Sequence, residues 1–84
     1  GQAGGGVTPP DDEIAATLLA LAAERGPGKS FCPSEAARRL SPDWRTLMPE
    51  VRRVAASLPL IATQRGVPVD PVTARGPIRL SARA

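Results

Sequence analysis

The feature that most constrains the fold is a pair of short strand-like segments near the end of the chain, after a first part that is helical throughout. The segments are residues 60–66 and 76–81, and the residues between them include two prolines. Two such segments joined by turn-forming residues predict an antiparallel β-hairpin. Three helices followed by one hairpin is an α+β, mostly helical arrangement of the winged-helix type.

The length of the chain limits it to one domain. Its 84 residues are close to the size at which a lone hydrophobic core stabilises a fold only marginally, so a two-domain enzyme is excluded. Residues 1–10 include a glycine-rich stretch and are expected to form an N-terminal tail, disordered or left by processing or tagging. Residues 11–84 are expected to form the winged-helix-like domain.

The first predicted helix spans residues 11–25. Ile14, Leu18 and Leu21 are spaced by four and three residues, which places them on one face of a helix. Asp11 is expected to be the N-cap, because a carboxylate accepts hydrogen bonds from the free N–H groups of the first turn. The apolar stretch of this helix is too short to span a membrane.

Prolines set the limits of the next two helices. Pro33 suits the first position of a helix over residues 33–40, because the N–H that proline lacks has no helical partner there. Pro49 is not expected inside a continuous helix, so the third helix is predicted over residues 49–58. Trp44 lies in a short turn before that helix and is expected to be largely buried, because it is the largest apolar side chain in an aromatic-poor chain.

The hairpin is predicted to pair residues 60–65 with residues 77–81 in antiparallel fashion, with a wing over residues 65–75. Side chains alternate between the two faces of a strand. The residues expected to face the core are Ile61, Ile78 and Leu80. The residues expected to face water are Thr63, Arg79 and Ser81.

Charge is distributed unevenly along the chain. Residues 1–40 carry four basic and five acidic side chains, whereas residues 41–84 carry seven basic and three acidic ones, so the two parts have net charges of −1 and +4. This asymmetry suggests that the C-terminal part contacts an anionic partner. In a winged helix the third helix enters the major groove of DNA and the wing lies on the flanking backbone. The candidate nucleic-acid-binding residues are Arg52 and Arg53 at the groove, with Arg65, Arg75 and Arg79 on phosphates.

Catalysis is not expected. The chain has no histidine and one cysteine, so Cys32 has neither an imidazole base nor a disulfide partner. The segment Gly28-Lys29-Ser30 follows a helix rather than a strand, which argues against a phosphate-binding loop. Consecutive carboxylates at residues 11–13 do not converge on one metal ion. We therefore expect no catalytic residue, no metal, no cofactor and no small-molecule ligand, and the lone cysteine favours the cytoplasm.

Three segments of the chain resemble a known family. They are residues 43–52, which include Trp44, residues 32–35, and residues 64–80, which contain a Pro-Val-Asp-Pro turn and an Arg-Gly-Pro approach to the last strand. In these segments the chain resembles a family of small bacterial winged-helix-like proteins known only as a domain of unknown function. The likeness spans residues 12–81, and it implies a fold and no activity.

Two functions of different kinds fit the sequence. The first is binding of nucleic acid, most simply DNA, through the third helix and the wing. The alternative is a protein-interaction module with no nucleic-acid partner, because a winged-helix fold does not by itself fix a function. A membrane partner is not expected. The two functions are separated by whether the exposed arginines of the third helix and the wing form one continuous face.

Overall fold

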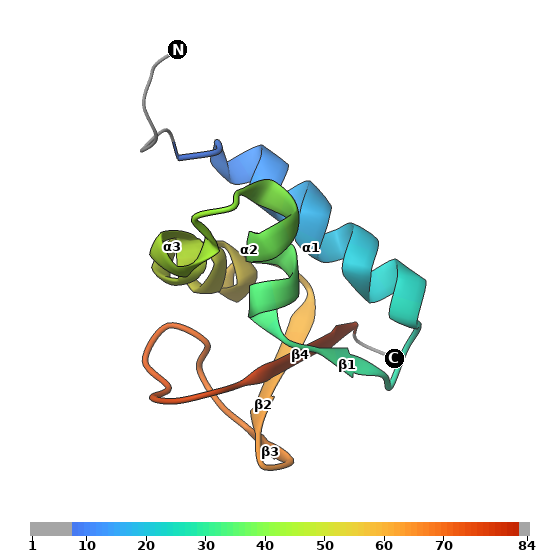
Figure 1. Cartoon of the computed structure of the whole chain (residues 1–84). Helices are drawn as coiled ribbons and strands as arrows, with labels where there is room; N and C mark the ends of the chain where they lie inside the picture. Colours follow the sequence, from blue (N-terminus) through green and yellow to red (C-terminus); the bar gives the residue numbers. More distant parts are fainter. Residues whose placement is uncertain (1–7, 83–84) are drawn as a thin grey trace.

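The computed structural model describes residues 8–82, so most of the predicted tail and the last two residues lie outside the described part. The elements are α1 (Asp11–Arg25), β1 (Ser30–Phe31), α2 (Pro33–Leu40), α3 (Trp44–Ala56), β2 (Leu60–Gln64), β3 (Val67–Pro68) and β4 (Arg79–Ala82). The strands form one antiparallel sheet in the order β1-β4-β2-β3, below the three helices in Figure 1. The predicted α+β class, three helices followed by a hairpin, is confirmed.

Helix α1 has the predicted bounds, but its N-cap is not the predicted residue. Its N-cap is Pro10, which is extended, with φ −66° and ψ 158°. Asp11 is therefore the first residue within the helix, and the prediction that it caps the helix is wrong. Ile14, Leu18 and Leu21 are fully buried, as their spacing predicts. Their burial turns one stripe of α1 toward the other two helices and the sheet.

Helix α2 also has the predicted bounds, because both of its ends carry clear local signals. Pro33 occupies its first turn, and Cys32 is the extended N-cap residue. The backbone N–H of Cys32 donates to Oε2 of Glu35 at 3.0 Å, so the glutamate reaches back to the start of the helix. The backbone N–H of Ser41 donates to the carbonyl of Ala37 at the other end.

Helix α3 is continuous from Trp44 to Ala56, so the predicted break at Pro49 and the predicted end at residue 58 are wrong. Pro49 lies on the exposed side of the helix. Leu47 and Val51 on the opposite side are 4% and 0% exposed, so residues just before and just after the proline are anchored in the core. That packing offsets the one backbone hydrogen bond that proline cannot donate.

The predicted pairing of the last strands is confirmed, since β2 and β4 are antiparallel with Ala62 opposite Leu80 and Thr63 opposite Arg79. Ile78 and Leu80 are buried as predicted, but Ile61 is 36% exposed and Ala62 is 7% exposed in its place. The reason is the register. Pairing with Leu80 puts Ala62 on the inner face, and Ile61 must then point outward. Strands β1 and β3 are two residues each, too short for a periodic signal in the sequence.

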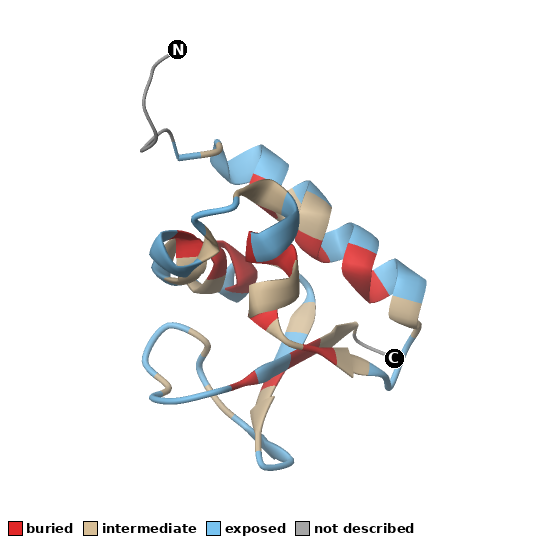
Figure 2. Cartoon of the chain, in the orientation of Figure 1, coloured by how far each residue is buried: buried red, intermediate tan, exposed pale blue. Residues whose placement is uncertain are grey.

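One apolar core lies between the helices and the sheet, as the buried segments in Figure 2 show. Phe31 of β1 lies in it with no exposed surface, and it contributes the largest fully buried side chain. No polar or charged residue is buried within residues 8–82. Among the same residues, no helix has both the length and the apolar character needed to cross a membrane.

Candidate nucleic-acid interface

Trp44 starts helix α3, and its side chain is of intermediate exposure and packs against the core, which agrees with the prediction that it is largely, though not fully, buried. It is one of the partly buried residues that pack against the core. The guanidinium carbons of Arg38, from the last turn of α2, and Arg45, the next residue of α3, each lie 4.5 Å from the centroid of the indole. The ring thus carries two cation–π contacts.

Arg53 is held in ion pairs. Its Nη1 and Nη2 donate to the two carboxylate oxygens of Asp11 at 3.0 and 2.7 Å, and Nη2 also donates to Oε1 of Glu50 at 2.6 Å. The hydrogen bonds from Arg53 lower the pKa of the Asp11 carboxyl, and those to Asp11 and Glu50 raise the pKa of the guanidinium. A phosphate or a base would have to compete with two carboxylates for this side chain.

Arg52 forms hydrogen bonds with the backbone of the loop that leads to β4. Its Nη1 donates to the carbonyl of Ala74 at 2.7 Å, and its Nη2 donates to the carbonyl of Gly76 at 2.6 Å. Gln64 of β2 donates from Nε2 to the carbonyls of Arg75 and Pro77. The four consecutive carbonyls of residues 74–77 therefore accept hydrogen bonds alternately from α3 and from β2, and these bonds fix the course of the loop. Because the carbonyls are uncharged, the positive charge of Arg52 is not neutralised.

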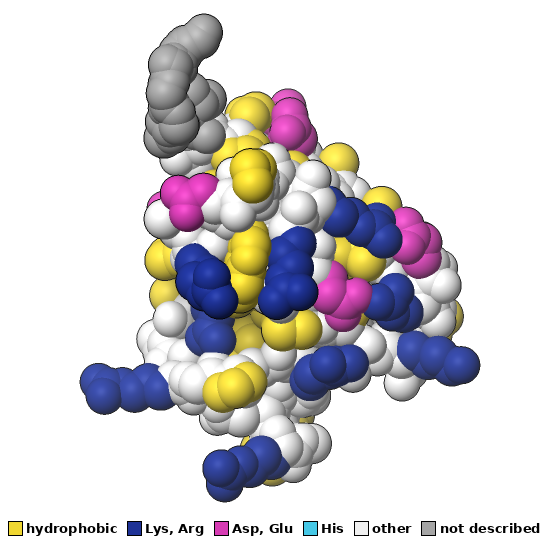
Figure 3. All heavy atoms as spheres, in the orientation of Figure 1, with side chains coloured by type: hydrophobic (Ala, Val, Ile, Leu, Met, Phe, Trp, Pro, Cys, Tyr) yellow, Lys and Arg dark blue, Asp and Glu magenta, His cyan; other side chains and the backbone are white. Residues whose placement is uncertain are grey.

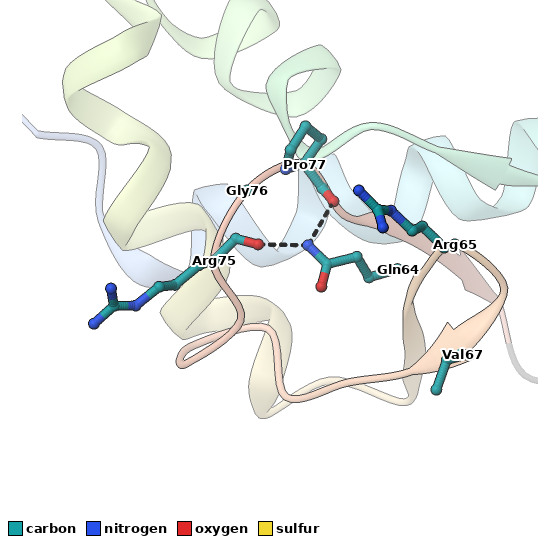
Figure 4. Close-up of a pocket in the computed structure, with 6 residues that line it drawn as sticks. All are labelled: Gln64, Arg65, Val67, Arg75, Gly76 and Pro77. Atoms are coloured by element: carbon teal, nitrogen blue, oxygen red, sulfur yellow. Dashed lines mark hydrogen bonds between the residues drawn. The ribbon is translucent and has the colours of Figure 1, made fainter.

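A hollow lies between this loop and the turn that joins β2 to β3. Its lining residues are Gln64, Arg65, Val67, Arg75, Gly76 and Pro77. Figure 4 shows Arg65 and Arg75 on two different segments, with the side chain of Arg65 extending toward Pro77 and that of Arg75 extending away from the other labelled residues. Both arginines are exposed. The structure thus brings two of the predicted site residues to one hollow.

Arg65 has an unusual backbone conformation. Its φ is 54°, and it is the one residue other than glycine with a positive φ within the described chain. Gly66 follows with φ 82°, so the two form the tight turn between Gln64 and Val67, which are paired across β2 and β3. Turns of this kind favour Asn or Gly at both central positions. An arginine there is costly to local stability, which makes its side chain a candidate for function.

Arg79 lies on the exposed, outer side of the sheet, as predicted. Its Nε donates to the hydroxyl of Ser30 at 3.0 Å, and its Nη2 donates to the Ser30 carbonyl at 2.9 Å. These bonds tie β4 to β1 and hold the guanidinium in place. They involve no acidic group, so Arg79 keeps an uncompensated positive charge.

Acidic residues elsewhere neutralise other arginines. Arg25 pairs with Glu35, and Arg39 pairs with Glu24 through two hydrogen bonds of 2.8 and 2.9 Å. Within residues 8–82, the basic side chains that form no ion pair are Lys29, Arg38, Arg45, Arg52, Arg65, Arg75 and Arg79. In the view of Figure 3, the acidic side chains lie over the helices, whereas Lys and Arg are the charged side chains over the strands below them. On the face seen in Figure 3, the region over the strands is therefore positively charged and shows no acidic side chain.

Arg38 and Arg45 are the residues that reasoning from sequence missed. Arg45 is the second residue of α3, but the expectation that Pro49 begins the helix placed it in a turn. Arg38 lies in the negative N-terminal part of the chain, where the charge balance gave no reason to single it out. A helix assigned from Trp44 onward would have revealed Arg45, because the first turn of the second helix in a helix-turn-helix is the part that contacts bases.

Other candidate sites have local structural roles. Cys32 is at the start of α2, and its sulfur accepts a hydrogen bond from the hydroxyl of Ser34 at 3.0 Å. Lys29 precedes the two-residue strand β1, so the residues around it form a turn and no helix directly follows. Across the described residues, no group of three His, Cys, Asp or Glu side chains is placed to hold a metal ion.

A family model with the description "Protein of unknown function (DUF3253)" matches residues 11–83. No curated protein has a sequence that matches the chain.

Proposed function

This chain belongs to the DUF3253 family of proteins of unknown function, and we propose that it is a winged-helix domain that binds duplex DNA. The observation that carries the proposal is the division of its basic residues into two groups. Arg25, Arg39 and Arg53 are paired with carboxylates. The unpaired ones lie in the last turn of α2, along α3, in the loops beside the sheet and on the sheet itself.

Helix α3 has the geometry that groove binding requires. Residues of an α-helix are rotated by about 100° from one to the next, so Arg45, Pro49 and Arg52 lie along one stripe. Leu47 and Val51 are buried on the other side. The stripe is therefore turned away from the core. Its N-terminal end carries Arg45, in the position from which a recognition helix contacts base edges.

The wing supplies the phosphate contacts. Arg65, in the turn between β2 and β3, and Arg75, in the loop before β4, are exposed, and neither makes an ion pair among the described residues. Arg52 bonds to the carbonyls of the loop that bears Arg75, and this links the wing to the proposed recognition helix. A rigid connection of this kind keeps the two contact regions at a constant separation, which reduces the ordering cost of binding. Arg53 has a lesser part here than the sequence predicts, because its charge is already compensated.

The test is a salt titration of binding to a fluorescently labelled duplex of mixed sequence. If arginines displace counterions from phosphates, the logarithm of the association constant falls linearly with that of the salt concentration, by about 0.9 per contact. Arg75→Gln should reduce this slope by about 0.9. Arg39→Gln removes the same charge from an ion pair with Glu24 and should leave the slope unchanged. No binding at low salt would reject the proposal, since this electrostatic contribution needs no particular sequence.

One observation favours the alternative, a protein partner at the wing. Val67 and Val72 are 60% and 54% exposed, and Val67 lines the hollow beside Arg65. Exposed apolar side chains near a basic rim are typical of protein-binding surfaces. If the chain fails to bind DNA at low salt, this surface becomes the leading candidate for its function.

A further inference from the structure

We propose that the cluster formed by Arg38, Trp44 and Arg45 reads guanine in the major groove, with Arg45 as the contacting residue and Trp44 as the positioning residue. This proposal rests on the proposed binding of duplex DNA and adds the base that the domain prefers. The observation that supports it is a combination of features in Arg38 and Arg45 that no other arginine of the described chain has. The two guanidinium groups are held in place, yet all of their hydrogen-bond donors remain free.

The first step of the argument concerns position. Each guanidinium carbon lies 4.5 Å from the indole centroid of Trp44, and the ring is itself fixed by contact with the core. A long arginine side chain on a surface ordinarily samples many rotamers, and fixing it costs free energy. Contact with the ring restricts Arg38 and Arg45 before any ligand arrives. A ligand that they bind then meets a smaller entropic cost.

The second step concerns hydrogen bonding. A cation–π contact uses the face of the guanidinium, whereas its five N–H groups point outward in the plane. Within residues 8–82, neither Arg38 nor Arg45 donates a hydrogen bond or forms an ion pair. By contrast, Arg52 and Arg79 donate hydrogen bonds to backbone carbonyls, and Arg53 donates hydrogen bonds to carboxylates. The cluster therefore presents two planar guanidinium groups that are held in position and whose N–H donors have no acceptor within the described chain.

The third step concerns the ligand. Guanine offers two acceptors, O6 and N7, on one edge in the major groove, and a guanidinium meets them with two parallel hydrogen bonds. Arg45 is the second residue of α3, at the end of the helix that would enter the groove. Phosphate also accepts two hydrogen bonds, but it lies on the rim of the groove, which Arg65 and Arg75 are better placed to reach. Guanine is thus the acceptor that suits this position.

The experiment begins with selection from a random duplex pool by the whole chain, at a salt concentration where nonspecific binding is measurable. Enriched duplexes should share a G·C pair, and changing it to A·T should weaken binding by about 5- to 150-fold. Replacing that guanine by 7-deazaguanine removes only the N7 acceptor and should also weaken binding. Trp44 is the only tryptophan in the chain, so its fluorescence should change on binding.

Variants separate base reading from charge. Arg45→Lys keeps the positive charge but not the two-pronged donor, so it should abolish the preference for G·C while the salt slope stays the same. Trp44→Leu should reduce the preference, and Trp44→Phe should restore most of it because an aromatic face returns. Thermal unfolding of each variant shows whether it is folded.

The outcomes distinguish this inference from the function on which it rests. If the chain binds duplex DNA but the selected sequences share no guanine, or if Arg45→Lys retains the full preference for G·C, the inference is wrong and the proposed function stands. If the chain binds no duplex at low salt, the proposed function fails first.

Discussion

Replacing Arg65 by glycine should make the protein more stable and a weaker binder of DNA. Arg65 has a φ of 54°, and the left-handed region costs a residue with a Cβ about 1–2 kcal/mol. Glycine removes that cost but adds about 0.4–1 kcal/mol of unfolded-state entropy. The net gain is about 0.5–1 kcal/mol, and within the described residues the Arg65 side chain makes no hydrogen bond whose loss would offset it.

Urea denaturation measures the stability change, and thermal unfolding should show a midpoint raised by about 2–8 °C for a domain of this size. The salt slope of binding to a mixed-sequence duplex should become less steep by about 0.9 in the same variant. Arg75→Ala is the control, since φ is not positive at residue 75 and the variant should lower the slope with no gain in stability. A glycine variant that is less stable, with an unchanged slope, would show that Arg65 has a structural role and refute the reasoning.

Three further predictions concern the fold. Phe31→Ala should lower the free energy of unfolding by about 3–5 kcal/mol in urea, because the ring is fully buried, and a loss below about 1 kcal/mol would contradict its central place in the core. Pro49→Ala should raise the free energy of unfolding by about 1–3 kcal/mol, because alanine supplies the missing backbone N–H on the exposed side of α3; equal stability would mean that the proline ring makes a compensating contact. Arg53 lowers the pKa of Asp11 from its ordinary 3.8, so their pairing stabilises the fold at neutral pH and is lost as pH falls through the lowered pKa. Arg53→Gln should therefore lose less stability than the wild type between about pH 6 and about pH 3 in chemical denaturation, and identical losses would show that the pair does not contribute.

The parts of the fold that could be predicted are those with strong local signals. The bounds of α1 and α2 follow from apolar spacing and from proline and glycine at their ends. The break at Pro49 was wrong because a local rule about proline ignores the burial of Leu47 and Val51 on both sides of it. The assignment of Ile61 to the core was wrong because it relied on hydrophobicity, whereas pairing with β4 decides which face is buried.

The candidate interface was predictable only in part. Arg65, Arg75 and Arg79 carry unpaired charge, as the basic C-terminal part of the chain suggested. Arg38 and Arg45 were missed, although they flank the one tryptophan. Their contact joins the end of one helix to the start of the next, and neither periodicity nor net charge reports such a contact.

By itself, the sequence determined the order of the helices and of the two main strands, and the excess of arginine after residue 40. Only the tertiary structure decided which arginines have charge to offer a ligand. Arg53 is neutralised by Asp11, which is 42 residues away in the chain, whereas Arg52 keeps its charge but donates its hydrogen bonds to carbonyls more than twenty residues away. The physical reason is that an ion pair or a hydrogen bond depends on a separation of a few ångströms in space. Composition counts charges, and folding alone sets the distances between them.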